Sequence, residues 1–201
     1  MVSRSFLFIV ILTVSIVPAA QAQDVRAQDV RAWWDSGLGL SAASRGTGAS
    51  GRSGLHVLIG RLMLGARVSV NNGGPSEQAS GLLGGHFRDT FYDVGGLVGY
   101  ARSTGNTTLA VGGGPSVLWG ERMTGVSDPG PCFGIICPRG QPIVEEVGRV
   151  VGLAVEAGAY FHLTRYLGLN VVFHGNANRE QSLAGLTLGL TVGKLRGATD
   201  P

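Results

Sequence analysis

The chain has 201 residues, of which 34 are glycine and 14% are charged, and its formal net charge is +3. This length allows one domain, and the small charge without a Lys/Arg cluster argues against nucleic-acid binding. Gly, Ser, Thr and charged residues interrupt every later apolar run, so no segment is long enough for a membrane-spanning helix. The glycines alternate with Leu, Val and Ala and have no collagen period, which places them in strands.

The first 22 residues combine an early arginine, a short apolar run and a final Ala-Gln-Ala. This pattern predicts a secretory signal peptide over residues 1–22, and an uncleaved N-terminal anchor is the alternative. Residues 23–32 then form a polar lead-in, and the pentapeptide Ala-Gln-Asp-Val-Arg occurs twice here, at 22–26 and 27–31. The barrel domain proposed below spans residues 33–196, and residues 197–201 form a C-terminal tail.

From Trp33 onward, apolar residues alternate with small or polar ones, which is the period-two pattern of strands with two different faces. In chain order the predicted strands are 34–43, 54–59, 62–71, 90–102, 107–120, 149–163, 167–177 and 183–195. The alternation changes phase between Ile59 and Leu62, which predicts a two-residue turn at Gly60-Arg61 rather than one long strand.

The connections between these strands alternate in length. Those at 60–61, 103–106 and 164–166 are short, that at 178–182 is moderate, and those at 44–53, 72–89 and 121–148 are long. An even strand number, one apolar face and unequal loops predict an all-β fold, a closed antiparallel eight-stranded up-and-down transmembrane β-barrel of the bacterial outer membrane. A soluble lipocalin-like binding barrel, the alternative, would carry its bulky apolar residues inside and many charges outside.

Aromatic residues fall near the predicted strand ends, as in the two interfacial girdles of a membrane barrel. The predicted interfacial set is Trp34, Tyr100, Phe161 and Tyr166 toward the periplasm and Tyr92, Trp119 and Phe173 toward the outside. Aromatic residues are also common in strands generally, which is the simpler explanation.

Three segments, at 91–100, 166–169 and 176–188, resemble the small outer-membrane barrels of the OmpA and OmpX kind and an uncharacterised outer-membrane barrel-domain family. The resemblance covers most of the mature chain and implies surroundings of outer-membrane lipid. One departure concerns the C-terminus. The usual barrel-assembly signal ends in an aromatic residue, whereas here Leu195-Arg196 is followed by Gly-Ala-Thr-Asp-Pro.

An eight-stranded barrel has room inside for side chains but not for a wide channel, so inward polar residues should form a packed plug. The predicted members of this lumenal network are Arg67, Asp93, Glu156, His162 and His174. A turn centred on Arg165 would place Glu156 opposite His174 and predicts a contact between them. Catalysis or proton relay is the alternative role. The lumenal histidines, among them His56, lie on separate strands without ligand spacing, so we expect neither a metal nor a cofactor.

Cys132 and Cys137 lie in the long connection 121–148, and in an exported chain this spacing predicts a local disulfide rather than a zinc site. Loops on a rigid scaffold commonly carry function. The sequence therefore predicts a structural or surface-interaction role through the outer loops, with an envelope or extracellular partner contacting loop 121–148. A lipid-modifying barrel enzyme is the alternative, although no G-x-S-x-G elbow occurs.

Overall fold

A computed structural model describes residues 30–43, 46–78, 86–127 and 141–195, and these residues form eight strands. The strands are β1 (Val30–Ala43), β2 (Gly46–Ile59), β3 (Leu62–Gln78), β4 (His86–Thr104), β5 (Thr107–Val126), β6 (Pro142–His162), β7 (Leu167–Ala177) and β8 (Leu183–Gly193). The described part of the chain contains no helix with the length and hydropathy needed to cross a membrane.

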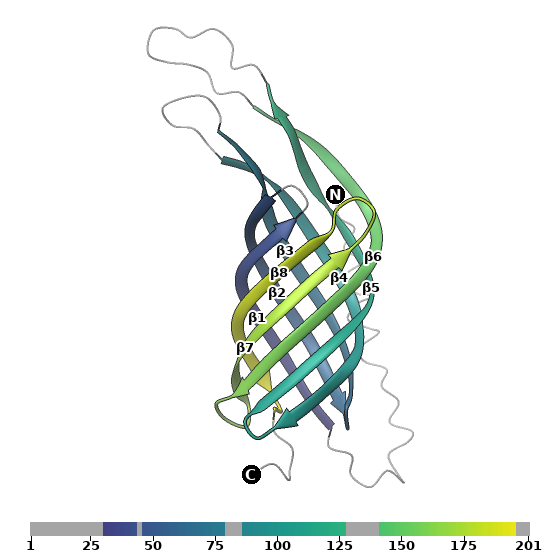
Figure 1. The fold of residues 1–201 in the computed structure, drawn as a ribbon, viewed down its shortest axis with the longest axis vertical. Helices are drawn as coiled ribbons and strands as arrows, with labels where there is room; N and C mark the ends of the chain where they lie inside the picture. Colours follow the sequence, from purple (N-terminus) through teal and green to yellow (C-terminus); the bar gives the residue numbers. More distant parts are fainter. Residues whose placement is uncertain (1–29, 44–45, 79–85, 128–140, 196–201) are drawn as a thin grey trace, which may run out of the picture.

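Each strand pairs antiparallel with the next, and β8 pairs with β1, so the sheet closes into a ring (Figure 1). The closing seam is continuous from Trp33 opposite Gly193 to Ala43 opposite Leu183. Closure leaves no sheet edge within the ring, which satisfies the backbone groups of every strand there. The predicted all-β, up-and-down eight-stranded barrel is confirmed.

Side chains alternate between a buried interior and an exposed apolar exterior along every strand. Leu38 and Leu188, which face each other across the β1–β8 seam, are 77% and 63% exposed. The interior instead holds buried charged and polar side chains, including Arg52, Arg67 and Asp93. A water-soluble protein would reverse this distribution, because exposing so much apolar surface to water is unfavourable.

Two ends of the barrel are distinguished by their connections. The short-turn end carries the turns 60–61, 105–106 and 163–166, and the predicted turn at Gly60-Arg61 is confirmed. Gly60 and Gly105 have positive φ angles of 63° and 56°, which suits tight hairpin turns. The opposite end, named the hairpin end, carries strands that continue beyond the ring (Figure 1).

The prediction of three long loops is partly wrong, because strands extend into all three segments. β2 begins at Gly46 inside the predicted loop 44–53, and β3 and β4 extend into 72–89. β5 runs to Val126 and β6 begins at Pro142, so both arms of the predicted loop 121–148 are paired strand. Residues 46–53 of β2 pair with β1 inside the ring and carry Arg52 on their inward side. The extensions of β5 and β6 beyond the ring need no apolar face, because they do not alternate between lipid and interior.

The N-terminal boundary also differs from the prediction, since β1 begins at Val30 within the predicted lead-in 23–32. At the other end of the chain, β8 ends at Gly193, and Lys194 and Leu195 pack back on the short-turn end through backbone hydrogen bonds to Ala32 and Arg165. The predicted signal peptide and the tail 197–201 lie outside the described residues.

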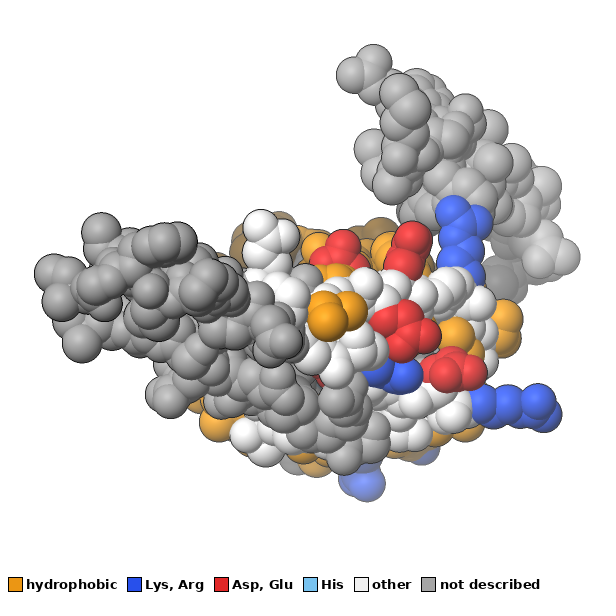
Figure 2. All heavy atoms as spheres, turned by 90° about the horizontal axis from the view of Figure 1, so that it is seen from above, with side chains coloured by type: hydrophobic (Ala, Val, Ile, Leu, Met, Phe, Trp, Pro, Cys, Tyr) orange, Lys and Arg blue, Asp and Glu red, His pale blue; other side chains and the backbone are white. Residues whose placement is uncertain are grey.

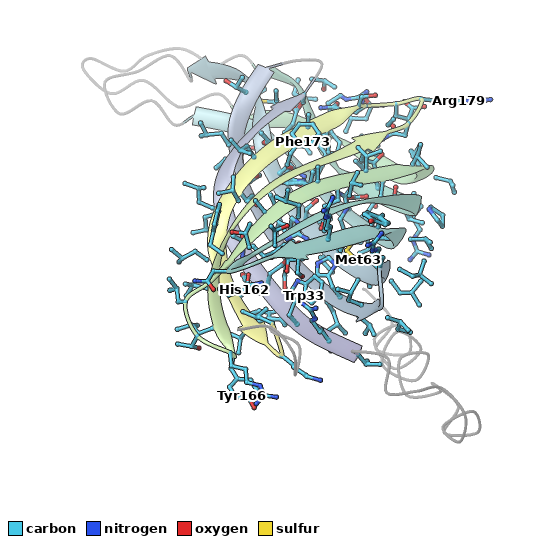
Figure 3. All side chains as sticks on the ribbon, turned by 60° about the horizontal axis from the view of Figure 1, so that its bottom comes forward. Trp33, Met63, His162, Tyr166, Phe173 and Arg179 are labelled. Carbon is cyan, nitrogen blue, oxygen red and sulfur yellow. The ribbon has the colours of Figure 1, made fainter. Side chains whose placement is uncertain are left out.

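Two apolar clusters fill different heights of the barrel interior. The first lies toward the short-turn end and includes Trp33, Met63 and Tyr160, and Figure 3 shows Trp33 and Met63 within the ring of strands. The second lies toward the hairpin end and includes Phe91 and Leu118. The two arginine-centred polar clusters described below lie between these apolar clusters, so the interior is packed as a core.

Glycine at position 189 is required by close approach of strands at the closing seam. A Cβ atom there would lie 1.9 Å from the Ser36 carbonyl oxygen of β1. We therefore expect Gly189→Ala to destabilise the barrel by about 1–3 kcal/mol, through forced separation of β1 and β8. The measurement is the urea midpoint of unfolding in detergent micelles. Gly96→Ala is the matched control, because its Cβ would meet nothing within 4 Å; equal midpoints for both variants would contradict the tight seam.

Candidate functional site

The first polar cluster of the interior is centred on Arg52 of β2. Its Nη1 atom donates to Asp35 Oδ1 of β1 at 2.5 Å, while Nε and Nη2 donate to the two carboxylate oxygens of Glu156 on β6 at 3.0 and 2.6 Å. All three side chains are almost completely buried. One guanidinium thus bridges two carboxylates, and its bond to Glu156 is bidentate, the strong form of this interaction.

Aromatic rings pack directly beneath this cluster on the side of the short turns. His56 Nε2 lies 3.2 Å from Asp35 Oδ2, and the His56 ring stacks on Trp33 with centroids 5.2 Å apart. Tyr160 contacts the Trp33 ring edge-on at 5.4 Å and donates a long hydrogen bond of 3.5 Å to Glu156. The ion-paired cluster is therefore joined to the first apolar cluster without a break.

The second polar cluster is centred on Arg67 of β3. Its Nη2 atom donates to Asp93 Oδ2 of β4 at 2.7 Å and to the Gly175 carbonyl of β7 at 2.5 Å. The other oxygen of Asp93 accepts from Asn176 Nδ2 at 2.5 Å, and the same amide donates to Ser116 of β5 at 2.8 Å. Side chains from four strands thus meet across the interior, which ties distant parts of the ring together.

The five residues predicted as one lumenal network are all buried, but the structure brings them together only in part. Arg67 and Asp93 share one cluster and Glu156 belongs to the other. Glu156 and His174 pair in the predicted register, yet the Glu156 carboxylate bonds to Arg52, and His174 Nε2 has no hydrogen-bond partner among the described residues. His162 lies near the short turns, with its Nε2 atom 3.0 Å from the Thr108 hydroxyl.

Arg52 and Asp35, which form the first cluster with Glu156, are absent from the predicted network. Arg52 falls in the stretch predicted as loop 44–53, where the outward residues Thr47, Ala49, Gly51 and Ser53 are too small to reveal alternation. One signal in the sequence could have found it. Leu55, Val57 and Ile59 face outward at odd positions, so the even positions His56, Gly54 and Arg52 face inward. Arg52 is the residue that this alternation would have identified.

All seven predicted interfacial aromatic residues are exposed on the outside of the barrel. Tyr92 and Trp119 stack with ring centroids 5.9 Å apart, and the Trp34 indole donates to Ser53 Oγ at 2.7 Å. In Figure 3, Tyr166 lies at the short-turn end and Phe173 toward the opposite end. Their positions suit two interfacial belts, which stay a prediction.

Metal and disulfide chemistry concern the histidines, cysteines and carboxylates of the chain. Within the described ranges, no group of three or more His, Cys, Asp or Glu residues is arranged to hold a metal ion. Cys132 and Cys137 lie outside the described residues, so their disulfide stays a prediction. The polar chemistry that the structure does describe is ion pairing and hydrogen bonding inside a filled barrel.

Comparison with protein families and with curated proteins gives no match. Comparison with solved structures gives several matches. Neisserial surface protein A matches with a TM-score of 0.55 at 14% identity, over 82% of this chain and 96% of that one. The chain has the fold of the small outer-membrane β-barrels. Ail, the attachment invasion locus protein of Yersinia pestis, solved with the heparin analogue sucrose octasulfate, matches with a TM-score of 0.53 at 11% identity, over 82% and 99%. The N-terminal β-barrel domain of Pseudomonas aeruginosa OprF matches with a TM-score of 0.50 at 9% identity, over 83% of this chain and 98% of that one.

These similarities confirm the resemblance to small outer-membrane barrels at the level of the fold. The outer-membrane location is a property of those proteins, and for this chain it stays a prediction. None of the three proteins is named for an enzymatic activity. At such low identity the ligands and partners of those proteins do not transfer to this chain by similarity.

Proposed function

We propose that this protein is an integral outer-membrane barrel that serves as a rigid, non-conducting anchor, and that its hairpin end contacts an extracellular or envelope partner. The observation that carries the proposal is the inverted distribution of side chains, with an apolar exterior around an ion-paired, filled interior. Hydrocarbon solvates such an exterior, and an eight-stranded barrel accommodates such an interior. In this orientation the short turns face the periplasm.

The filled interior supports an anchor rather than a pore. Arg52 and Arg67 each bridge groups from several strands, and apolar clusters lie on both sides of these two centres. Breaking buried ion pairs costs several kcal/mol, so a water path through them would be opposed by about that free energy. The same packing keeps the ring rigid beneath its extensions.

The hairpin end supports a surface role because paired strands project from it. β5 and β6 remain paired out to Val126 opposite Pro142, beyond the β4 pairing that stops at Glu121. Figure 2 shows acidic and basic side chains gathered over this end, surrounded by apolar ones. A projecting ribbon on a rigid ring is a suitable place to present a binding surface.

The charged residues at the hairpin end argue against a strongly anionic partner. The exposed acidic residues here include Glu121, Glu145, Glu146 and Glu180, and the cations include Arg122, Arg149 and Arg179. These residues provide no excess of positive charge for a sulfated ligand of the kind solved with Ail. The proposed partner therefore has a neutral or mixed-charge surface, and the predicted Cys132–Cys137 disulfide would stiffen the segment between the two arms.

Cell fractionation of the full chain tests the anchor. We expect recovery in the outer membrane, a β-type circular dichroism spectrum, a heat-dependent shift in gel mobility and no stable conductance in planar bilayers. Replacing residues 127–141 by a short glycine linker should leave these properties intact and abolish surface binding. Free solubility in the periplasm would favour the lipocalin-like alternative, and a changed lipid acylation pattern on gene deletion would favour the enzyme.

A further inference from the structure

We propose that the short-turn end of the barrel binds anionic phospholipid headgroups of the leaflet beside it. The surface consists of five cationic residues, called here the basic rim: Arg31, Arg61, Arg102, Arg165 and Lys194. The inference rests on the proposed function, because it requires the barrel to be inserted in a bilayer. It goes further by assigning this end a preferred class of lipid.

Arg61 and Arg102 are neighbours across the β2–β3 turn and the end of β4. The Ala101 amide donates to the Arg61 carbonyl at 2.9 Å, and Leu62 pairs with Tyr100 one step further into the sheet. Both arginines are exposed, and Leu62 and Tyr100 beside them are exposed on the apolar exterior. The backbones that carry these two arginines thus lie side by side where the apolar surface ends.

The other three cations continue around the same end. Arg165 is exposed in the β6–β7 turn, with its guanidinium carbon 5.7 Å from the Tyr166 ring centre. Lys194 follows β8 and donates to the Val30 carbonyl at 2.9 Å. Arg31 of β1 donates to Ser103 Oγ at 2.7 Å. The positive charge is therefore distributed around the ring rather than on one strand.

Among the described residues, no carboxylate pairs with the exposed guanidinium groups of Arg61, Arg102 and Arg165. In the described ranges, the acidic side chains nearest to this end in the strands are Asp35 and Glu156, which are buried and already bound by Arg52. Phosphate groups at the membrane surface are the anions that this position would meet. Cationic side chains near an anionic leaflet gain free energy from it, and long side chains reach the headgroups from an apolar surface.

The test measures lipid selectivity beside the Arg61 and Arg102 pair. Tyr100→Trp, in a background of Trp34→Phe and Trp119→Phe, places an exposed tryptophan two residues before Arg102 and leaves only the buried Trp33 of the natural three. The full chain is refolded into phosphatidylcholine vesicles that contain equal fractions of either brominated phosphatidylglycerol or brominated phosphatidylcholine. We expect stronger quenching by phosphatidylglycerol, corresponding to a preference of roughly fivefold for each arginine.

Adding Arg61→Gln and Arg102→Gln should remove most of this preference, and high salt should weaken it. Arg149→Gln with Arg179→Gln, at the hairpin end, is the matched control and should leave it unchanged. Equal quenching by the two brominated lipids in an inserted barrel would overturn the lipid preference and leave the anchor standing. Absence of quenching by both lipids would instead show that the barrel does not insert, and would overturn the proposed function itself.

Discussion

Replacing Arg52 with methionine should lower the free energy of unfolding by about 3–5 kcal/mol, because Asp35 and Glu156 would then be buried without their shared cation. Methionine keeps much of the side-chain volume, so the expected loss is electrostatic rather than a cavity. Urea unfolding in phospholipid vesicles, followed by tryptophan fluorescence and the heat-dependent gel shift, measures it. No other single substitution in the described interior is expected to leave two carboxylates uncompensated.

Two control variants distinguish the loss of the ion pairs from a general folding defect of Arg52→Met. Arg149→Met changes an exposed arginine at the hairpin end and should alter stability by no more than about 0.5 kcal/mol. The triple replacement Arg52→Met, Asp35→Asn and Glu156→Gln removes all three charges and should recover a large part of the loss. A triple variant as unstable as Arg52→Met would show that packing, not charge, is the main role of this cluster.

Replacing Leu188 with arginine should destabilise the barrel by about 2–4 kcal/mol in a bilayer, because the proposed insertion places this mid-strand position at the middle of the hydrocarbon. Leu188 is 63% exposed and pairs with Leu38 on one side and Val171 on the other. On a soluble barrel the same exposed position would tolerate arginine with little change. Unfolding in vesicles therefore distinguishes the two environments directly.

Val30→Arg is the matched control for this prediction. Val30 is also exposed but lies at the very start of β1, at the short-turn end, where a charge should cost only about 0–1 kcal/mol. If both substitutions are tolerated equally, the apolar exterior does not face lipid. If both are equally costly, the effect arises from the strands themselves rather than from depth in the membrane.

The strand number, the pairing order and the outward faces could be predicted from the sequence, because lipid requires large apolar residues at alternate positions. The sixth strand shows this clearly, since Val151, Leu153 and Val155 are all exposed on the outside as their alternation predicts. The pairing of Glu156 with His174 also followed from a short turn, which fixes the register of adjacent strands.

The composition of the interior clusters could not be predicted in the same way. Arg52 and Glu156 are separated by 104 positions and lie on β2 and β6, which are not neighbours in the ring. Their contact depends on the diameter and stagger of the closed barrel, and pairwise register between adjacent strands does not contain that information. The extent of β2 was missed for a local reason, since its first outward residues are small.

The paired arms of β5 and β6 also make this barrel a natural scaffold for display. Beyond Glu121, the last residue of β5 that pairs with β4, the ladder between them runs from Arg122 opposite Glu145 to Val126 opposite Pro142. These bonds separate the tip of the hairpin from the ring, so the ring need not change when the tip does. Epitopes inserted between the two arms should therefore reach the cell surface without disturbing the assembly of the membrane-embedded part.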